Sequence, residues 1–287
     1  MHKIIKTMSD EATKTVSRFY SEIGWKIDEG ITEDARRWED LRECAAAYVS
    51  KCRMRVARQI PAAGDAILDM ASGPIQYSEY LEYSRNFKKR YCIDLSAEAL
   101  RLAEMRIGSH GQYLHGDFLE MTDLPDDFFD CSISLHTIYH IHPDRQEEAV
   151  RKLLRVTKPG HPVIIVYSNP KSLILRFISP ARFVLRVMRK LKRAILNRSS
   201  AIATSPSEPV PYFHAYPLNW WRRFDDISDV EVLPWRSFRA ADQKRLFPNN
   251  IIGCQMFDFL FWLEDRFPGF FAAHFQYPLV VMTKRLA

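Results

Sequence analysis

The sequence lacks long apolar runs and paired cysteines. No window reaches the roughly 18 uncharged apolar residues of a membrane span, and the N-terminal stretch has no apolar signal-peptide core. The five cysteines are an odd number without a C-x-x-C pair, which argues against a secreted disulfide framework and a thiolate zinc site. We therefore expect a cytoplasmic protein with reduced thiols, soluble or at most peripheral at the inner membrane face.

The composition is that of an ordinary globular protein. The 287 residues are 47% hydrophobic and 26% charged, which excludes disordered, collagen-like and disulfide-rich classes. No internal repeat is visible. The length suits one large domain, or one domain with an inserted cap.

Positive charge is concentrated in one segment. The chain carries 41 Lys and Arg against 35 Asp and Glu, yet residues 171–200 hold nine basic residues and no acidic one. Four arginines there recur at the spacing of an amphipathic helix: Arg182, Arg186, Arg189 and Arg193. Three interpretations stay open: a solvated helix that covers the core, a helix on an anionic membrane or acidic ligand, and an RNA-binding helix.

Short apolar runs alternate with helical patterns from about residue 66, as in a parallel sheet wrapped by helices. The predicted strands are 66–70, 90–94, 112–118, 129–135, 161–168 and 278–284, with a weaker one at 230–235. Ser96 and Gly108 bound one predicted helix, and Pro143 opens another. Parallel strands end at one edge of the sheet, where such folds bind ligands.

The chain is expected to divide into four parts. Residues 1–60 are predicted to be a helical N-terminal lid, 61–169 the α/β core, 170–217 an inserted basic cap, and 218–287 the completion of the sheet. Seven phenylalanines and one tryptophan crowd 257–275. Such density favours core packing, and the wall of an apolar acceptor pocket is the alternative.

Three acidic residues follow successive predicted strands. Asp69 precedes the small-residue turn Ala71-Ser72-Gly73, where backbone can approach a ligand closely. Asp94 suits the two hydroxyls of a ribose. Asp117, beside Phe118, suits an adenine amino group and ring. In this order the three carboxylates describe an adenosine-shaped slot.

The turn after Asp69 indicates which adenosine cofactor is bound. A pyrophosphate needs G-x-G-x-x-G, and a nucleoside triphosphate needs a P-loop. The sequence has neither, and Pro74 removes one N–H that a phosphate would use. S-adenosylmethionine (SAM), which carries no phosphate, remains.

Residues 67–168 resemble the core of class I SAM-dependent methyltransferases. The resemblance is to the broad methyltransferase-domain group that includes quinone, polysaccharide, lipid and natural-product enzymes. The stretches ILDMASGPI, CIDLS, HGDFLEM, FDCSISLHTIYHI and LLRVTKPG resemble the family motifs in their usual order. The resemblance implies a Rossmann-like, mostly parallel sheet of seven strands with helices on both faces and an antiparallel last strand.

The resemblance also implies the cofactor-binding residues. The methionine and ribose portion would contact Asp69, Ala71, Ser72 and Gly73, and the ribose hydroxyls would contact Asp94 and Leu95. The adenine would contact Asp117 and Phe118, and the sulfonium would contact Leu135 and His136. Ala71 and Ile75 stand where the family has glycine. A positive φ at Ala71 would cost about 1 kcal/mol, and Ile75 is expected to narrow the slot.

Histidines cluster after the fourth strand of the core. His140 or His136 is the predicted general base, because histidine titrates near neutral pH. The alternative is a purely structural hydrogen bond. His136, His140 and His142 have no partnered acidic residues, so no metal site is predicted.

The motifs also limit the substrate. The [DNS]-P-P-[YFW] tetrad of base-amino methyltransferases is absent, as are paired catalytic cysteines, so DNA is excluded as a substrate. Only the basic segment favours an RNA substrate, and it lacks the interleaved aromatic side chains on which bases stack. We predict O-methylation of a small-molecule or lipid-linked saccharide acceptor, with an anionic membrane surface as a partner of residues 182–193. The alternatives are an RNA methyltransferase and a non-catalytic SAM-binding or membrane-docking module.

Overall fold

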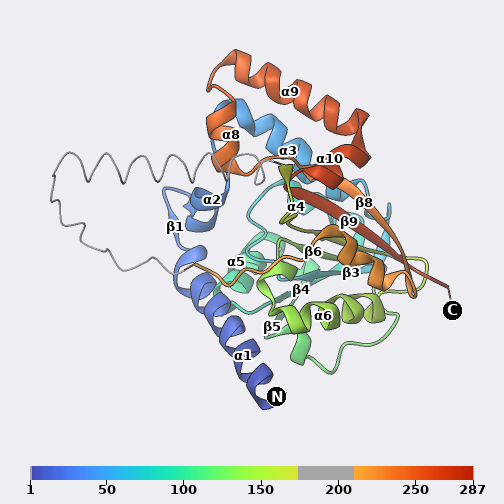
Figure 1. Ribbon diagram of the computed structural model, residues 1–287. Helices are drawn as coiled ribbons and strands as arrows, with labels where there is room; N and C mark the ends of the chain where they lie inside the picture. Colours follow the sequence, from blue (N-terminus) through green and yellow to red (C-terminus); the bar gives the residue numbers. More distant parts are fainter. Residues whose placement is uncertain (1, 174–209, 287) are drawn as a thin grey trace, which may run out of the picture.

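A seven-stranded sheet with helices on both faces forms the body of the molecule (Figure 1). The computed structural model describes residues 2–173 and 210–286. The strand order is β5-β4-β3-β6-β7-β9-β8. The strands are β3 (Gly64–Met70), β4 (Phe87–Asp94), β5 (Gly111–His115), β6 (Cys131–Leu135), β7 (Pro162–Val166), β8 (Ser228–Arg236) and β9 (Tyr277–Lys284).

The register of the sheet brings the carboxyl ends of the central strands together. Strand β3 pairs in parallel with β4 and β6, with Asp69 opposite Cys92 and Ile133. Only β9 runs antiparallel to its two neighbours, β7 and β8. The predicted Rossmann-like sheet with an antiparallel last strand is confirmed. Strand β5 ends at His115, so Asp117 and Phe118 lie in the following loop rather than in the strand.

The helices begin and end where local signals place them. Ser96 caps α5 by accepting a hydrogen bond from the Ala99 N–H at 3.3 Å, and Gly108 ends the helix at φ +49°. Pro143 is the first residue of α6. The helices are α1 (His2–Phe19), α2 (Glu33–Trp38), α3 (Glu43–Ala57), α4 (Glu79–Glu82), α5 (Ala97–Ile107), α6 (Pro143–Val156), α8 (Ala240–Leu246), α9 (Ile251–Arg266) and α10 (Pro268–His274).

Shorter helical turns connect these elements. A π-helical turn, η1 (Tyr20–Gly24), continues α1, and 3-10 turns occupy Gly108–His110, Phe118–Glu120, Ile138–His140 and Leu218–Phe224. The last of these buries Trp220, Trp221 and Phe224 in the main core cluster, against β7 and β9.

The N-terminal region is helical, but it is not one continuous lid. It contains a small hairpin, β1 (Ile27–Asp28) and β2 (Ile31–Thr32), which turns at Gly30 with φ +78°. Helix α3 lies beside α9 at the top of the view in Figure 1, and Tyr48 stacks on Phe257 at 5.0 Å. Helix α9 lies some 200 residues from α3 in the chain, so no local sequence pattern indicates this packing.

The phenylalanine-rich segment 257–275 divides into two groups. Phe257 and Phe271 are buried with Tyr48 in one core cluster, as the core-packing interpretation expects. Phe259, Trp262 and Phe270 are more than half exposed. None of the segment lines the large cavity described below, so the pocket-wall alternative is wrong.

The predicted basic helix, with Arg182, Arg186, Arg189 and Arg193, lies outside the described residues. Across residues 2–173 and 210–286, the helices are all too short or too polar to span a membrane.

Candidate cofactor and acceptor site

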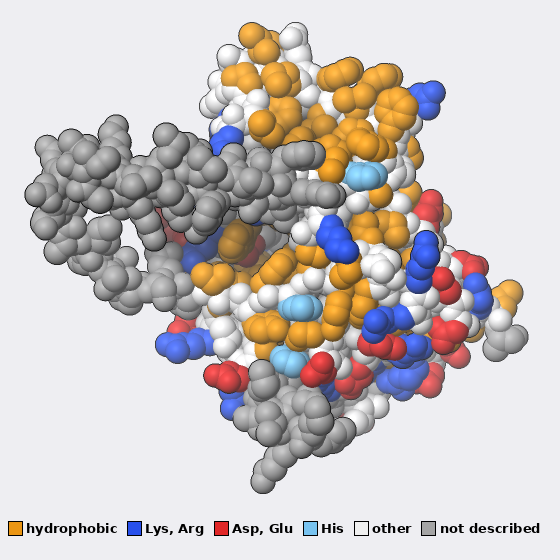
Figure 2. Space-filling view, viewed as in Figure 1, with side chains coloured by type: hydrophobic (Ala, Val, Ile, Leu, Met, Phe, Trp, Pro, Cys, Tyr) orange, Lys and Arg blue, Asp and Glu red, His pale blue; other side chains and the backbone are white. Residues whose placement is uncertain are grey.

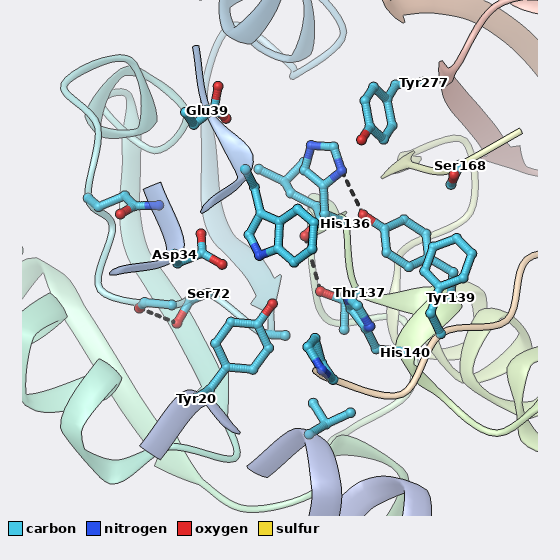
Figure 3. Close-up of a pocket in the computed structure, with 18 of the residues that line it drawn as sticks. Tyr20, Asp34, Glu39, Ser72, His136, Thr137, Tyr139, His140, Ser168 and Tyr277 are labelled. Carbon is cyan, nitrogen blue, oxygen red and sulfur yellow. Dashed lines mark hydrogen bonds between the residues drawn. The ribbon is translucent and has the colours of Figure 1, made fainter. Parts of the chain in front are cut away.

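A cavity of about 530 Å³ opens at the carboxyl ends of β3, β4 and β6. Its lining comes from parts of the chain that are far apart in sequence, and Figure 3 shows side chains from several of them pointing into the same space. The lining includes the predicted residues Asp69, Ala71, Ser72, Gly73, Asp94, Leu95, Leu135, His136 and His140. This volume accommodates a cofactor with a small acceptor beside it.

The turn after β3 keeps a glycine-like backbone. Ala71 has φ +57°, Gly73 φ +57° and Ile75 φ +51°. The left-handed conformation costs about 1–2 kcal/mol for each non-glycine residue. Ile75 is fully buried against Leu100 and Ala103 and does not line the cavity. The expectation that Ile75 narrows the slot is therefore wrong, because its side chain packs behind the turn.

Asp94 holds this turn in place. Its two carboxylate oxygens accept hydrogen bonds from the Gly73 N–H at 2.9 Å and from the Ser96 N–H at 2.8 Å. Burial raises the pKa of Asp94 to about 6, and the two backbone donors act in the opposite direction. The carboxylate thus joins the turn after β3 to the start of α5, on the wall of the cavity.

Asp69 is oriented by a partner that the sequence analysis missed. The guanidinium of Arg90, fully buried on β4, donates to the Asp69 carboxylate, with Nε at 3.1 Å. Burial raises the pKa of Asp69, and Arg90 counteracts this shift. A basic residue at the start of the apolar run RYCID was the one available signal, because a cation in a buried strand needs a partner.

Asp117 and Phe118 line a second, smaller hollow beside the main cavity. The two hollows share Ala71, Asp94 and Leu95. Asp117 caps the turn that follows, accepting from the Leu119 N–H at 2.9 Å. The structure therefore brings the predicted adenine-binding pair next to Asp94, although not into the main cavity itself.

His136 adopts a strained backbone conformation at the end of β6. Its φ is +61°, and its Nδ1 lies 2.9 Å from the Tyr139 hydroxyl. Its ring packs 4.5 Å from the Trp235 ring and 5.3 Å from the Tyr277 ring. Burial, followed by the charge of Arg236, lowers the pKa of His136 well below its usual range. The imidazole is therefore neutral at pH 7.

His140 also lines the cavity as a neutral imidazole. Its Nδ1 lies 2.5 Å from the carbonyl oxygen of Tyr212, and burial lowers its pKa to about 4. A carbonyl only accepts hydrogen bonds, so Nδ1 carries the proton and Nε2 carries the lone pair. This contact fixes the tautomer that a proton acceptor needs.

The N-terminal region contributes side chains that the sequence analysis did not select. Tyr20 and Asp34 point into the cavity from η1 and α2 (Figure 3). The Trp25 ring stacks on Tyr20 at 5.0 Å, and a Cβ at Gly73 would meet that ring at 3.1 Å. Glycine at position 73 therefore lets the indole pack directly on the turn. Burial and the charge of Glu39 raise the pKa of Asp34 to about 7.

The far wall of the cavity is held by buried ion pairs. Arg236, on β8, donates to the Glu39 carboxylate at 2.6 Å, and Arg53 lies 3.7 Å from the same carboxylate. Tyr277 and Gln276 line this wall from the start of β9 and the residue before it. Glu39 and Arg236 are 197 residues apart, so no local sequence pattern indicates their pairing. Within the described residues, no group of three His, Cys, Asp or Glu side chains has the arrangement of a metal site.

The family described as "Methyltransferase domain" matches residues 68–165. No curated protein matches the chain. The chain is similar in structure to phosphoethanolamine N-methyltransferase 1 of Haemonchus contortus, with a TM-score of 0.57 and 9% identity over 97% of this chain and 50% of that one. It is also similar to geranyl diphosphate C-methyltransferase of Streptomyces coelicolor A3(2), with a TM-score of 0.53 and 13% identity over 96% and 98% of the two chains. At these identities the likeness concerns the fold.

The matched segment runs from Leu68 in β3 to Ile165 in β7 and includes the turn, Asp94 and the two histidines. The residues present suit S-adenosylmethionine: a turn without a side chain at Gly73, a buried carboxylate beside it, and an adjoining hollow with an acid and an aromatic ring. Residues 68–165 thus match a methyltransferase domain, the sheet has the antiparallel last strand expected of class I SAM-dependent methyltransferases, and the residues of the cavity fit S-adenosylmethionine as the cofactor.

Proposed function

We propose that this enzyme methylates a hydroxyl group of a small-molecule acceptor bound in the cavity, with His140 as the proton acceptor. The hydrogen bond between His140 Nδ1 and the Tyr212 carbonyl carries the proposal, because it leaves the Nε2 lone pair for an acceptor proton. Methylation of a hydroxyl oxygen requires the loss of that proton. A neutral imidazole in the cavity wall can take it.

The cofactor-binding roles belong to the same proposal. The bound cofactor supplies a methyl group on a sulfonium, and the protein holds it in line with the acceptor oxygen. Asp94 would accept hydrogen bonds from the ribose hydroxyls. Asp117 and Phe118 would hold the adenine, and the backbone of 71–73 would run beside the methionine portion, with Asp69 oriented by Arg90. Leu135 would lie beneath the sulfonium.

His136 is proposed as a positioning residue and the weaker candidate for the base. Its Nδ1 contact with the Tyr139 hydroxyl leaves the tautomer open, because that hydroxyl can either donate or accept. Its left-handed backbone is a strained conformation of the kind that persists when the surrounding structure enforces it, often at functional sites. The packing of Trp235 and Tyr277 on the ring supports a fixed orientation.

A small acceptor suits the way the cavity is enclosed. Tyr20, Trp25 and Asp34 cover it from the N-terminal region, and residues at both described ends of the 170–217 segment, Pro170 and Phe213, also line it. This supports 1–60 as a cover for the site and 170–217 as a cap over the acceptor. A lipid-linked saccharide would place its hydroxyl group in the same cavity.

The two alternative functions have less support. The replacement of two family glycines by Ala71 and Ile75 would favour a non-catalytic module, yet both residues keep the left-handed conformation that the glycines would supply. An RNA substrate rests on the basic segment, which lies outside the described residues.

Calorimetric titration of SAM and S-adenosylhomocysteine into the purified protein tests the cofactor half of the proposal, with Asp94→Ala as the control. We expect micromolar binding that the variant loses. An acceptor screen weighted toward hydroxylated lipids and sugars tests the other half. Turnover only with amine or carbon acceptors would overturn the O-methylation proposal while leaving the cofactor site intact.

A further inference from the structure

The outward side of α9 and α10 is apolar. Six large side chains there are between 49% and 70% exposed. We define this apolar face as Ile251, Ile252, Phe259, Trp262, Phe267 and Phe270. Figure 2 shows hydrophobic side chains gathered at the top of the molecule, over the helices labelled α8, α9 and α10 in Figure 1. A soluble helix normally turns polar residues outward, so this face is suited to burial against another surface.

Helical geometry separates this face from the core. The buried residues of α9 are Gly253, Phe257, Leu260 and Glu264, which recur at intervals of three and four. Ile251, Phe259 and Trp262 lie on the opposite side of the same helix. The rings of Phe259 and Trp262 stack at 5.7 Å with an interplanar angle of 18°, which gives the face a flat aromatic surface. Helix α9 is therefore apolar both inward and outward.

The acidic side chains of α9 are all paired toward α3. Asp258 accepts from Lys51 at 2.7 Å. Asp265 and the buried Glu264 both accept from Arg55, at 2.6 Å and 2.7 Å. These pairs neutralise the carboxylates on the flank of the helix, so none of the acids of α9 faces outward without a counter-charge.

Basic side chains lie close to the apolar residues along the chain. Lys244 and Arg245 are exposed on the last turn of α8, and Arg266 is exposed on the last turn of α9, over the Phe267 ring at 5.3 Å. Among residues 2–173 and 210–286, these three side chains form no ion pair. The surface is thus an aromatic face with a positive margin, which is complementary to a negatively charged partner.

We propose that the apolar face docks on an anionic phospholipid bilayer, with its aromatic side chains among the acyl chains and its basic margin against the lipid phosphates. Aromatic residues flanked by Lys and Arg are the composition of helices that lie in the membrane interface. A second copy of the chain is a poorer partner, because face-to-face association would bring the same three basic side chains of each copy together. This inference does not depend on the acceptor or on His140.

Co-sedimentation of the full chain with phosphatidylcholine vesicles, with and without phosphatidylglycerol, tests the proposal. We expect binding that increases with phosphatidylglycerol. The double variant Phe259→Ser/Trp262→Ser should bind at least about tenfold more weakly, because two large apolar side chains no longer leave water. Charge reversal at Lys244, Arg245 and Arg266 should remove the preference for the anionic lipid.

Matched controls make the test decisive. Met105→Ser removes an equally exposed apolar side chain, 72% exposed on α5, and should leave vesicle binding unchanged. SAM affinity and the melting temperature should be the same in all variants, which shows that the fold is intact.

Three outcomes would overturn the proposal. The first is that the native chain does not bind vesicles. The second is that the double variant binds vesicles as well as the native chain does. Loss of binding on charge reversal at Arg182, Arg186, Arg189 and Arg193 would then assign the membrane contact to those arginines. The third is a dimer, seen by light scattering, that Phe259→Ser/Trp262→Ser converts to monomer, which would assign the face to a second copy.

Discussion

The two sides of the cavity are built in different ways. On the proposed cofactor side, Asp69, Gly73 and Asp94 lie within 26 residues of one another, at the ends of two paired strands. On the proposed acceptor side, Asp34, Glu39, Arg236 and Tyr277 come from the two ends of the chain. The residues of the cofactor side are placed by neighbouring βα units, whereas those of the acceptor side are brought together by packing between distant parts of the chain. Substitutions on the two sides should therefore affect different measurements.

His140→Ala should have the largest effect. It removes the proposed proton acceptor, and we expect kcat to fall by about 10²–10⁴-fold with a hydroxyl acceptor while SAM affinity changes far less.

The pH dependence of kcat tests whether His140 is the proton acceptor. The pKa of His140 is lowered to about 4, so its neutral form predominates above that pH. The acid limb of kcat should lie near pH 4. A limb near 6.5 would show that another group accepts the proton.

Asp34→Asn should change stability in a pH-dependent way. The pKa of Asp34 is raised from 3.8 to about 7, so the folded state holds its proton more tightly than the unfolded state. The native chain therefore loses stability as pH rises from about 4 to 7. The variant should be more stable by up to about 4 kcal/mol above pH 7, and by progressively less toward pH 4. Thermal melts of both proteins across this range measure the difference, and a constant difference would contradict the buried carboxyl.

Asp94→Ala should act on the cofactor side alone. It removes the acceptor for the Gly73 and Ser96 N–H groups, and the proposed acceptor for the ribose, so we expect SAM affinity to fall about 100-fold or more. In the native chain, SAM affinity should also fall below pH 6, where Asp94 becomes protonated. Asp94→Asn is the matched control and should bind weakly but without this pH dependence. Unchanged affinity in Asp94→Ala would exclude the proposed site.

Ala71→Gly should have the smallest effect. Glycine relieves the left-handed strain at φ +57° but makes the unfolded chain more flexible, so the net gain in stability should be at most about 1 kcal/mol. SAM affinity should stay the same or rise slightly, as calorimetry would show. A large loss of affinity would mean that the Ala71 methyl group contacts the cofactor.

Much of the sheet could be predicted because its signals are local. Ser96, Gly108 and Pro143 bound their helices as capping chemistry expects. The strands follow the apolar runs, apart from 112–118, where Gly116 at φ +146° ends the pairing before Asp117. The acidic residues at strand ends were visible for the same reason: each follows a run that is recognisable from its own composition.

The pairings across the molecule could not be predicted. The Arg90 partner of Asp69 is on the adjacent strand, and the Glu39 partner of Arg236 is nearly 200 residues away. The phenylalanine-rich segment shows the same limit. Its composition indicated burial, but only the position of α3 decides that Phe257 is buried and that Phe259 is exposed.

Local sequence patterns were enough to predict the order of strands and helices in the core, the acids at the strand ends and the small-residue turn, because hydrophobic periodicity and capping act over a few residues. Long-range packing sets which side chains cover those acids, which tautomer His140 adopts and which apolar side chains remain exposed. Those properties depend on burial and on partners brought together by folding, and neither is encoded within one local stretch of chain.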